Sequence, residues 1–189
     1  FPDDYTQWHN LYPDGWLSEY VGFDSGDNRV TALRVKNKYG QSNVFLDYQS
    51  HRIFDGRLSL GDLPCADADK NTQTLEISLV DRLTDLSVKL YYTVFPESDV
   101  ISRYAVYENN GDGDLNIEKS MSLCLDIPNC DFEMITLHGC WDNERNFERY
   151  PIRHGLQSIY SRRGMSSQEL NPFFALVSKD CDENKGLAY

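Results

Sequence analysis

Hydrophobic and polar residues alternate along much of the chain with the period of two that is typical of β-strands. Over residues 86–94, every second position is apolar, namely Leu86, Val88, Leu90, Tyr92 and Val94. Such a strand turns one face to a core and the other to water. The same alternation over residues 115–127, interrupted by Lys119, predicts a second long and half-buried strand.

Shorter runs with the same character predict further strands at 30–36, 44–48, 75–80, 100–108, 132–138, 157–161 and 173–178. Turn-forming residues separate the central strands at 96–99 and 109–114, where Gly and Asn tolerate positive φ and Asp or Ser bonds to the local backbone. No window combines a capped start with apolar residues at helical spacing. Helices should therefore be few and short.

This succession of hairpin-linked strands predicts an all-β fold of two antiparallel sheets packed face to face. With 189 residues, 40% of them hydrophobic, the chain can bury a core, and we expect residues 29–189 to form one sandwich domain. Residues 1–28 differ, because aromatic residues alternate there with Pro and Asp without any period. They should form an irregular, aromatic-rich arm that lies on its own sandwich or on a neighbouring subunit.

The charge balance narrows the range of partners. The formal net charge of −12 makes the surface repel phosphate backbones and anionic lipids, so we expect no nucleic-acid or membrane partner. The chain has no apolar run of about 18 residues, and its start lacks the features of a secretion signal. It begins with Phe1, however, which is also compatible with a signal that has already been removed.

Cysteine usage bears on both compartment and metal binding. The chain has five cysteines, Cys65, Cys124, Cys130, Cys140 and Cys181. An odd number in a chain of this size suits a reducing compartment, so we expect a cytoplasmic protein. No two cysteines stand two to four residues apart as in structural zinc sites, and the run at 109–114 lacks the ligand spacing of a calcium loop. We therefore expect neither a metal nor a cofactor.

Rings and charges alternate densely over residues 139–150. The indole of Trp141 offers an apolar plate to the C–H face of a pyranose, and Glu144 and Arg145 would supply hydrogen bonds to its hydroxyl edge. In the alternative interpretation, Trp141 fills the end of the sandwich and the charges pair with one another, each pair contributing about 0–1 kcal/mol. Composition alone leaves both open.

Other candidate sites carry weaker signals. The segment 161–167 combines Arg163 and Gly164 with serines, which suits either a phosphate or, as we favour, a turn whose arginines pair with acidic groups. A galectin-like site is disfavoured, because Arg145 follows Glu144 directly and no His-x-Asn-x-Arg strand precedes them. The four histidines are scattered, and no nucleophile elbow occurs, so we assign no catalytic residue.

Three stretches together resemble the amino-terminal domain of bacterial α-galactosidases of glycoside hydrolase family 36. They are S-H-R-I-F-D-G-R-L-S-L-G-D-L-P at 50–64, G-C-W-D-N-E-R at 139–145 with R-Y-P at 149–151, and G-L-Q-S-I-Y-S-R-R-G-M-S-S-Q-E-L-N-P-F-F-A-L at 155–176. The likeness extends in order from about Leu17 to Tyr189. It implies a β-supersandwich of the galactose mutarotase-like kind, in agreement with the strand pattern.

The resemblance also implies a division of labour. In that family a (β/α)8 barrel follows this domain and performs retaining hydrolysis of terminal α-D-galactosyl residues in melibiose- and raffinose-type oligosaccharides. Its nucleophilic Asp lies in a Lys-Trp-Asp-type barrel segment, which this chain does not contain. The resemblance therefore implies that the chain holds no catalytic residue and is inactive without its barrel.

Two substrate-binding residues are implied by the same resemblance. Trp141 is similar to a tryptophan that lines the sugar subsite. Family members are typically tetramers in which an acidic residue of the arm reaches a neighbour's pocket, and Asp4, or Asp3 beside it, is the nearest match in an arm that is shorter than usual. Gln168 and Leu170 stand where the family commonly has His, which would alter the oligomer if those histidines support the interface.

We therefore expect the amino-terminal β-sandwich of a cytoplasmic, oligomeric α-galactosidase, inactive alone, which shapes the rim of the substrate pocket through Trp141. Two alternatives remain. The chain could be a stand-alone galactoside-binding module that uses the same tryptophan. It could also be an aldose epimerase-like sandwich, which requires a paired His and Glu in a concave sheet face.

Overall fold

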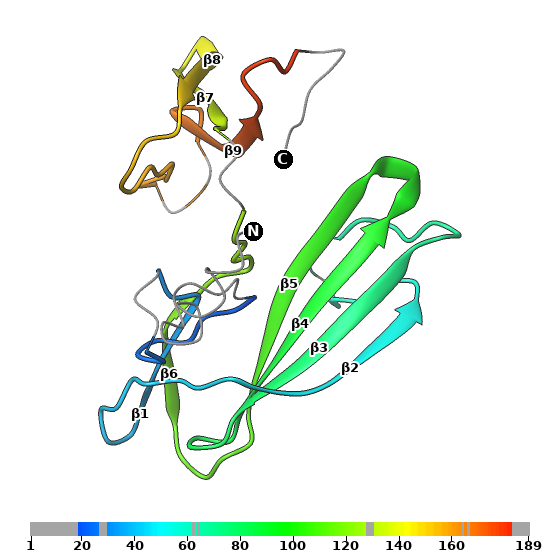
Figure 1. Cartoon of the computed structure of the whole chain (residues 1–189), viewed down its shortest axis with the longest axis vertical. Coiled ribbons are helices and arrows are strands. Elements are labelled where there is room, and N and C mark those ends of the chain that lie inside the picture. Colours follow the sequence, from blue (N-terminus) through cyan, green and yellow to red (C-terminus); the bar gives the residue numbers. More distant parts are fainter. Residues whose placement is uncertain are drawn as a thin grey trace, which may run out of the picture. The chain divides into compact units, whose positions relative to one another are not determined.

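A computed structural model describes residues 19–26, 30–61, 63, 65–127, 131–163, 165 and 167–182. These residues form nine strands, all in antiparallel sheets, and one short 3-10 helix, η2 (Pro96–Ser98) (Figure 1). The strands are β1 (Leu33–Asn37), β2 (Asp47–Asp55), β3 (Gln73–Asp81), β4 (Leu86–Phe95), β5 (Val100–Asn109), β6 (Leu115–Ser120), β7 (Glu133–Cys140), β8 (Asn143–Pro151) and β9 (Leu170–Val177). The predicted all-β antiparallel class is confirmed. No helix of the described residues is long and apolar enough to cross a bilayer.

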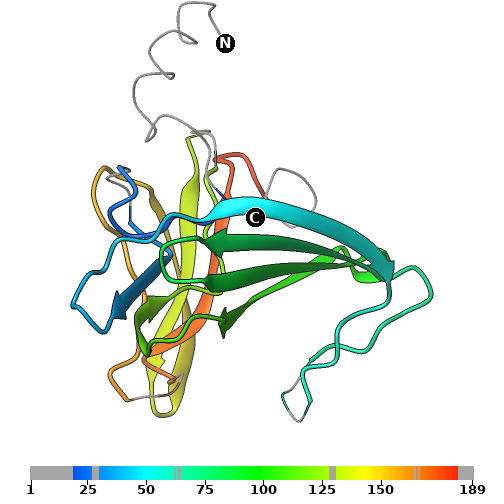
Figure 2. The same cartoon turned by 90° about the horizontal axis from the view of Figure 1, so that it is seen from below.

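The chain divides into two compact units, Phe1–Asp126 and Ile127–Tyr189. The first contains a four-stranded sheet in which β2, β3, β4 and β5 lie side by side in chain order, with β2 at one edge (Figures 1 and 2). Asp85 and Asp99 adopt positive φ of 54° and 52° in the two turns that flank β4. The predicted turn at 96–99 therefore lies where its residue types placed it.

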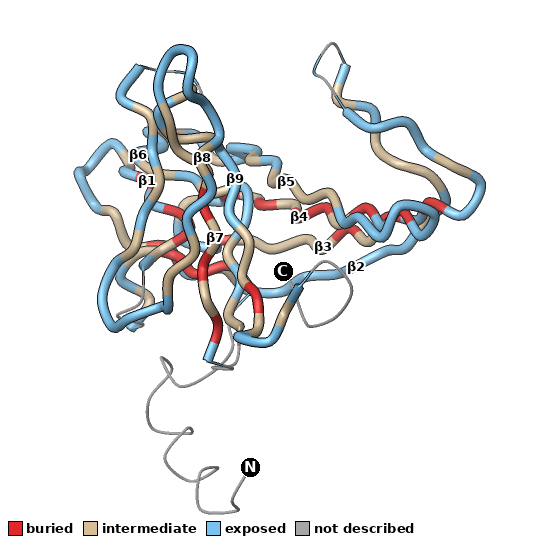
Figure 3. The backbone as a smooth tube through the Cα atoms, turned by 90° about the horizontal axis from the view of Figure 1, so that it is seen from above, coloured by how far each residue is buried: buried red, intermediate tan, exposed pale blue. Residues whose placement is uncertain are grey.

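The core of the first unit lies between this sheet and a second, two-stranded sheet of β1 and β6. Leu33 on β1 clusters with alternate residues of β4, among them Val88 and Leu90, and all three are fully buried. Figure 3 shows buried positions recurring along β4. The period of two over 86–94 thus identified the inward face, although its last member, Val94, is 42% exposed.

The segment before β1 packs on this unit as well. Tyr20 and Val21 are buried, and the Val21 carbonyl accepts a hydrogen bond from the amide of Ala32 at 2.8 Å. Gly22 has no room for a side chain, because a Cβ there would lie 2.2 Å from the carbonyl oxygen of Val44. Residues 1–18 of the predicted arm lie outside the described residues, as do 27–28.

Arg103 on β5 fastens two segments to the sheet. Its Nη1 donates to the carbonyl of Ser122, and its Nη2 lies 3.5 Å from the carboxylate of Glu19. The guanidinium also lies over the rings of Tyr20 and Tyr92, 5.4 and 5.0 Å from their centroids. A charged side chain that is only 5% exposed therefore joins the chain before β1 to the chain after β6.

Glu76 on β3 is a buried carboxylate between strands β2 and β4. It faces Arg52 on one side and Tyr91 on the other, and the Nη2 of Arg52 donates to its Oε2 at 2.6 Å. Burial alone would raise the pKa of Glu76, but the hydrogen bonds from Arg52 and Tyr91 outweigh it and hold the pKa below its usual range. Burial also raises the pKa of Tyr91 to about 12, so the phenol stays a donor.

Glu76→Gln is expected to lower the free energy of unfolding by about 1–2 kcal/mol near pH 7, because the variant loses a charge-assisted bond. The folded-state pKa of Glu76 is depressed, so this stabilisation is present above the unfolded pKa of about 4.3 and is lost as pH falls through the folded pKa. Urea unfolding should show a smaller difference in unfolding free energy between the wild type and Glu76→Gln at pH 3 than at pH 7. Glu108→Gln, at an exposed pair with Lys89, is the control. A difference of equal size at both pH values would contradict this account.

The second unit is a three-stranded sheet with β7 between β8 and β9. Thr136 of β7 faces Glu148 of β8 and Phe174 of β9, and it is buried with Met134 on the same face. Arg149 of β8 donates from Nε to Glu133 at 2.5 Å and from its two Nη atoms to the backbone carbonyls after β9. One guanidinium thus joins all three strands.

Four strand predictions needed correction. The strand predicted over 115–127 ends at Ser120, which pairs with Leu33 at the start of β1, and one further backbone bond joins the Met121 amide to the carbonyl of Ala32. Residues 157–161 form no strand with any residue that the structure describes, and the Gln157 side chain bonds instead to the carbonyl of Arg153. Residues 143–150, for which no strand was predicted, belong to β8, and β2 extends to Asp55 instead of stopping at 48.

Candidate functional site

The β7–β8 hairpin ends in a two-residue turn that consists of Trp141 and Asp142. Cys140 and Asn143 pair across its base, and Asp142 adopts a positive φ of 64°. The side chain of Trp141 is 83% exposed. The ring is therefore not buried in the hydrophobic interior, and the interpretation in which it fills the end of the sandwich is wrong.

A β-bulge lies directly behind this turn. His138 pairs with Asn146 and Cys140 pairs with Asn143, so two residues of β8, Glu144 and Arg145, oppose the single residue Gly139 of β7. A Cβ at Gly139 would lie 2.3 Å from the carbonyl oxygen of Asn143 and 2.8 Å from the Cα of Glu144. Only glycine fits at this position.

The base of the hairpin is tied to the segment that precedes β9. The amide of Gly139 donates to the carbonyl of Glu169 at 3.1 Å. The carboxylate of Glu169 accepts in turn from Nη2 of Arg163 at 2.7 Å. Backbone bonding and the bulge therefore hold the turn in one conformation, which reduces the entropy that a ligand must remove when it binds Trp141.

The charges at this tip do not neutralise one another. Glu144 and Arg145 are both exposed, and neither side chain forms a hydrogen bond or ion pair with another described residue. The interpretation of 139–150 as a salt-bridged loop therefore fails at its centre. We use the term "hairpin tip" for Trp141, Glu144 and Arg145, the three side chains that the turn and bulge present to solvent.

Arg145 has an unusual backbone conformation. Its φ is 58°, in the left-handed region, which costs a residue with a Cβ about 1–2 kcal/mol. Asp142, in the turn of the same hairpin, also lies in the left-handed region, with a φ of 64°. Strain of this kind is concentrated at sites that have a function.

In the segment 161–167, the described residues show partners for both arginines, one of them acidic, in keeping with the interpretation that we favoured over a phosphate site. Arg163 pairs with Glu169, as described, and its amide donates to the hydroxyl of Ser161 at 3.2 Å. Arg162 donates to the phenol oxygen of Tyr160 at 2.9 Å. Both arginines therefore already have partners, while Gly164 and Ser166 lie outside the described residues.

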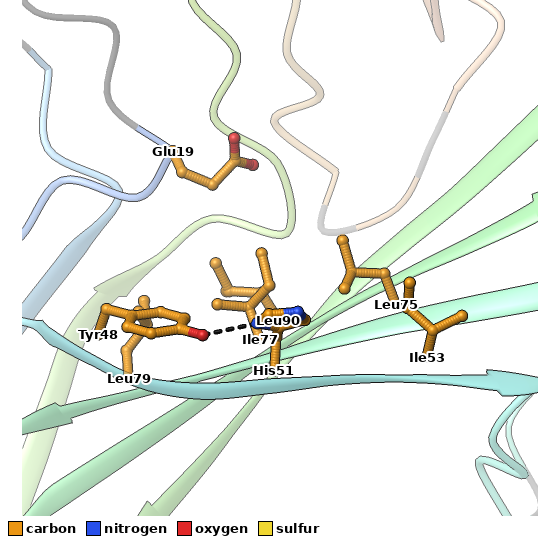
Figure 4. Close-up of a pocket in the computed structure, with 8 residues that line it drawn as sticks. All are labelled: Glu19, Tyr48, His51, Ile53, Leu75, Ile77, Leu79 and Leu90. Atoms are coloured by element: carbon orange, nitrogen blue, oxygen red, sulfur yellow. Dashed lines mark hydrogen bonds between the residues drawn. The ribbon is translucent and has the colours of Figure 1, made fainter.

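A pocket of about 540 Å³ lies in the first unit, on one face of the four-stranded sheet (Figure 4). Its polar residues are Glu19, Tyr48 and His51, and the Tyr48 hydroxyl is hydrogen-bonded to Nδ1 of His51 at 2.6 Å. The rest of the lining is aliphatic, formed by Ile53, Leu75, Ile77, Leu79 and Leu90.

This pocket bears on the epimerase alternative, because it contains both a His and a Glu. Glu19, however, already accepts a hydrogen bond from the Tyr92 hydroxyl and faces Arg103, while His51 is engaged by Tyr48. A hexose needs several polar partners, and five aliphatic side chains supply none. The pocket therefore suits apolar packing better than sugar chemistry.

Some residues that the sequence analysis singled out have no described structure. Asp4 and Asp3 lie outside the described residues, as does Cys130. Within the part of the chain that the structure describes, no three His, Cys, Asp or Glu side chains are grouped so that they could hold a metal ion.

Sequence reasoning proposed Trp141 as a substrate-binding residue, which stays a prediction, and it did not find the structural features that hold this residue. The steric need for Gly139 had one signal, since an isolated glycine within a strand pattern often marks a bulge. The left-handed backbone of Arg145 had none, because arginine is not typical of that conformation.

Comparison with known proteins agrees with the resemblance. The family model described as Glycosyl hydrolase family 36 N-terminal domain matches residues 3–189. Alpha-galactosidase AgaA from Geobacillus stearothermophilus is 39% identical over 178 residues, which cover 93% of this chain and 24% of that protein. The bifunctional alpha-galactosidase/sucrose kinase AgaSK from Mediterraneibacter gnavus is 39% identical over 177 residues, covering 93% and 19%.

The solved structures agree in fold. The crystal structure of AgaA from Geobacillus stearothermophilus aligns with a TM-score of 0.88 at 39% identity, over 92% of this chain and 24% of that one. The chain thus spans about a quarter of the length of AgaA and a fifth of AgaSK. With a match over nearly its whole length and relatives well above 30% identity, the chain belongs to the glycosyl hydrolase family 36 N-terminal domain family.

Proposed function

We propose that this chain is the N-terminal domain of an α-galactosidase that hydrolyses terminal α-D-galactosyl residues of melibiose- and raffinose-type oligosaccharides with retention. A Geobacillus stearothermophilus AgaA variant, 40% identical to this chain, has been crystallised in complex with raffinose. The observation that carries the proposal is the exposed indole of Trp141 on a pinned hairpin, in a chain of this family. The domain shapes the rim of the sugar pocket and does not perform the reaction.

The carboxylates of the described residues support this division. Retaining hydrolysis needs two carboxyl groups about 5–5.5 Å apart, one of them held protonated as the acid. The two buried carboxylates are Glu76, which Arg52 and Tyr91 keep ionised, and Asp81, which accepts from Thr84 and the amide of Leu83 in a turn. Both serve the fold. The family resemblance implies that a (β/α)8 barrel performs the chemistry, and we take that barrel as the partner of this domain.

Trp141 would stack on the apolar face of a galactosyl or neighbouring ring, because a rigid indole offers a large contact area at little entropic cost. Asp4 is the second proposed contact, donated from the arm to the pocket of a neighbouring subunit in a cytoplasmic homo-oligomer. Each contact adds affinity without any step of bond breaking. The domain acts on substrate binding alone.

A turnover assay tests the proposed activity. The isolated 189-residue chain and the polypeptide encoded by the complete gene are each given nitrophenyl α-galactoside. We expect turnover with retained configuration, followed by NMR, from the complete polypeptide and none from the chain. Robust turnover by the chain alone would contradict the division of labour. An inactive complete polypeptide would contradict the α-galactosidase assignment itself.

Two further measurements separate the rival functions. Titration calorimetry of the isolated chain with galactose or melibiose should give no heat, whereas millimolar or tighter affinity that disappears in Trp141→Ala would identify a stand-alone binding module. Polarimetry with galactose should show no acceleration of mutarotation. Acceleration that is lost in His51→Ala would restore the epimerase alternative.

A further inference from the structure

Arg145 stands apart from every other residue that shares its backbone conformation. Among the described residues, six other than glycine have positive φ, and five of these are aspartates: Asp24, Asp85, Asp99, Asp131 and Asp142. Aspartate tolerates this region because its short side chain bonds to the nearby backbone. Arginine has no such compensation. The local fold would therefore favour Gly, Asn or Asp at 145, and it does not account for an arginine.

The side chain of Arg145 does not compensate by stabilising the hairpin. It is exposed, and it forms no hydrogen bond, ion pair or ring contact with any residue that the structure describes, although Asp142, Glu144 and Glu148 lie in the same hairpin. Arg149, four residues further along β8, shows the opposite behaviour, with four hydrogen bonds. Folding therefore explains Arg149 but not Arg145.

The position of Arg145 beside Trp141 suits its guanidinium to binding a ligand. Arg145 belongs to the bulge that fixes the turn carrying Trp141, so the two side chains project from one rigid hairpin tip. A planar guanidinium presents five donors, which suits adjacent hydroxyl groups, and Trp and Arg are both enriched among the residues that contribute most to binding at protein interfaces. The ligand class that matches both is a sugar with one apolar face and a hydroxyl-bearing edge.

We propose that Arg145 is a specificity-determining residue that donates hydrogen bonds to hydroxyl groups of the oligosaccharide whose apolar face lies on Trp141. The strained backbone at 145 is retained for this contact. The inference rests on the proposed α-galactosidase function and adds to it a second, polar recognition residue. Arg145 discriminates between substrates by the hydroxyl pattern on the sugar, whereas Trp141 discriminates by the shape of the apolar face.

Arg145→Gly tests the proposal, because it removes the side chain and also relieves the backbone strain. In the polypeptide encoded by the complete gene we expect the KM for melibiose to rise about five- to tenfold while kcat stays within about twofold. The urea midpoint should stay unchanged or rise. Asp99→Gly is the matched control, since it relieves the same kind of backbone strain in a turn outside this hairpin and should leave KM within about twofold.

Each other outcome overturns the proposal. An unchanged KM in Arg145→Gly would show that the guanidinium does not touch the substrate. A lower urea midpoint in Arg145→Gly would show that the side chain serves the fold. Arg145→Lys, which keeps the charge but lacks the planar fork, should give an intermediate KM, and full activity in it would reduce the contact to charge alone. A wild-type polypeptide without turnover would overturn the proposed function, and this inference with it.

Discussion

Replacing Gly139 with alanine is expected to lower the free energy of unfolding by about 2–3 kcal/mol, since overpacking a closed site forces the backbone to move. The added Cβ would lie 2.3 Å from the carbonyl oxygen of Asn143 and 2.8 Å from the Cα of Glu144. Both are backbone atoms, so no side-chain rotation relieves the clash. The bulge must open, and the bond from the Gly139 amide to Glu169 is lost with it.

Urea unfolding of the chain measures this effect, and Gly113→Ala is the matched control. A Cβ at Gly113 meets only the flexible Lys38 side chain, 3.4 Å away, so that variant should stay within about 0.5 kcal/mol of the wild type. In the complete polypeptide, Gly139→Ala should also raise the KM for melibiose, because the turn that carries Trp141 moves. Equal stabilities for the two variants would show that the bulge accommodates a side chain.

Arg149→Met is expected to lower the free energy of unfolding by about 3 kcal/mol. The guanidinium donates to Glu133 and to the carbonyls of Ser178, Lys179 and Cys181. Hydrogen bonds to a charged group contribute about 1.5–3 kcal/mol each at most, and their loss leaves four acceptors without this donor. Methionine keeps much of the apolar stem, so the change removes chiefly the polar contacts.

Arg163→Met is the comparison for this variant, also by urea unfolding. Its single ion pair with Glu169 is exposed on both sides and should contribute about 0–1 kcal/mol. Arg149→Lys should fall between the wild type and Arg149→Met, since an ammonium group cannot reach all four acceptors. A loss in Arg149→Met no larger than that in Arg163→Met would contradict the assignment of Arg149 as the joint between three strands.

The strands that alternation identified best are those with one face in a core. Over 86–94 the inward residues Leu86, Val88 and Leu90 are buried in the cluster that β1 also joins, so burial imposed the pattern that the sequence displays. The turns at 96–99 and 82–85 hold aspartates at positive φ, in keeping with the tolerance of Asp for that region.

The errors share one physical cause, which is that pairing depends on a partner that sequence pattern does not reveal. Residues 121–127 keep the alternation of a strand, yet β1 begins at Leu33, opposite Ser120, and Leu123 and Leu125 are half-exposed. Strand β8 lacks alternation because its side chains are exposed or only partly buried, and it exists through its backbone bonds to β7. The pattern of apolar residues therefore predicts which side chains are buried, but it predicts poorly which strands pair and in which register.

The features of the candidate site that depend on strand pairing were also missed by the sequence analysis. Trp141 could be proposed from the sequence, since an indole among charged residues is chemically distinctive, and its contact with sugar stays a prediction. Its exposure, the bulge at Gly139 and the left-handed backbone of Arg145 arise from the pairing of β7 with β8 and could not be predicted. These features place the side chains of Trp141 and Arg145 on one fixed hairpin, which the composition alone did not predict.

The most direct test of the central claim is the KM for melibiose of the polypeptide encoded by the complete gene, with Trp141 intact or replaced by alanine. Contact between the indole and the sugar predicts a rise of about tenfold in KM, or about 1.4 kcal/mol, with kcat nearly unchanged, and Trp141→Phe should retain most of the affinity. Urea unfolding should show that neither variant loses stability, because the ring is 83% exposed. An unchanged KM in Trp141→Ala would contradict the account.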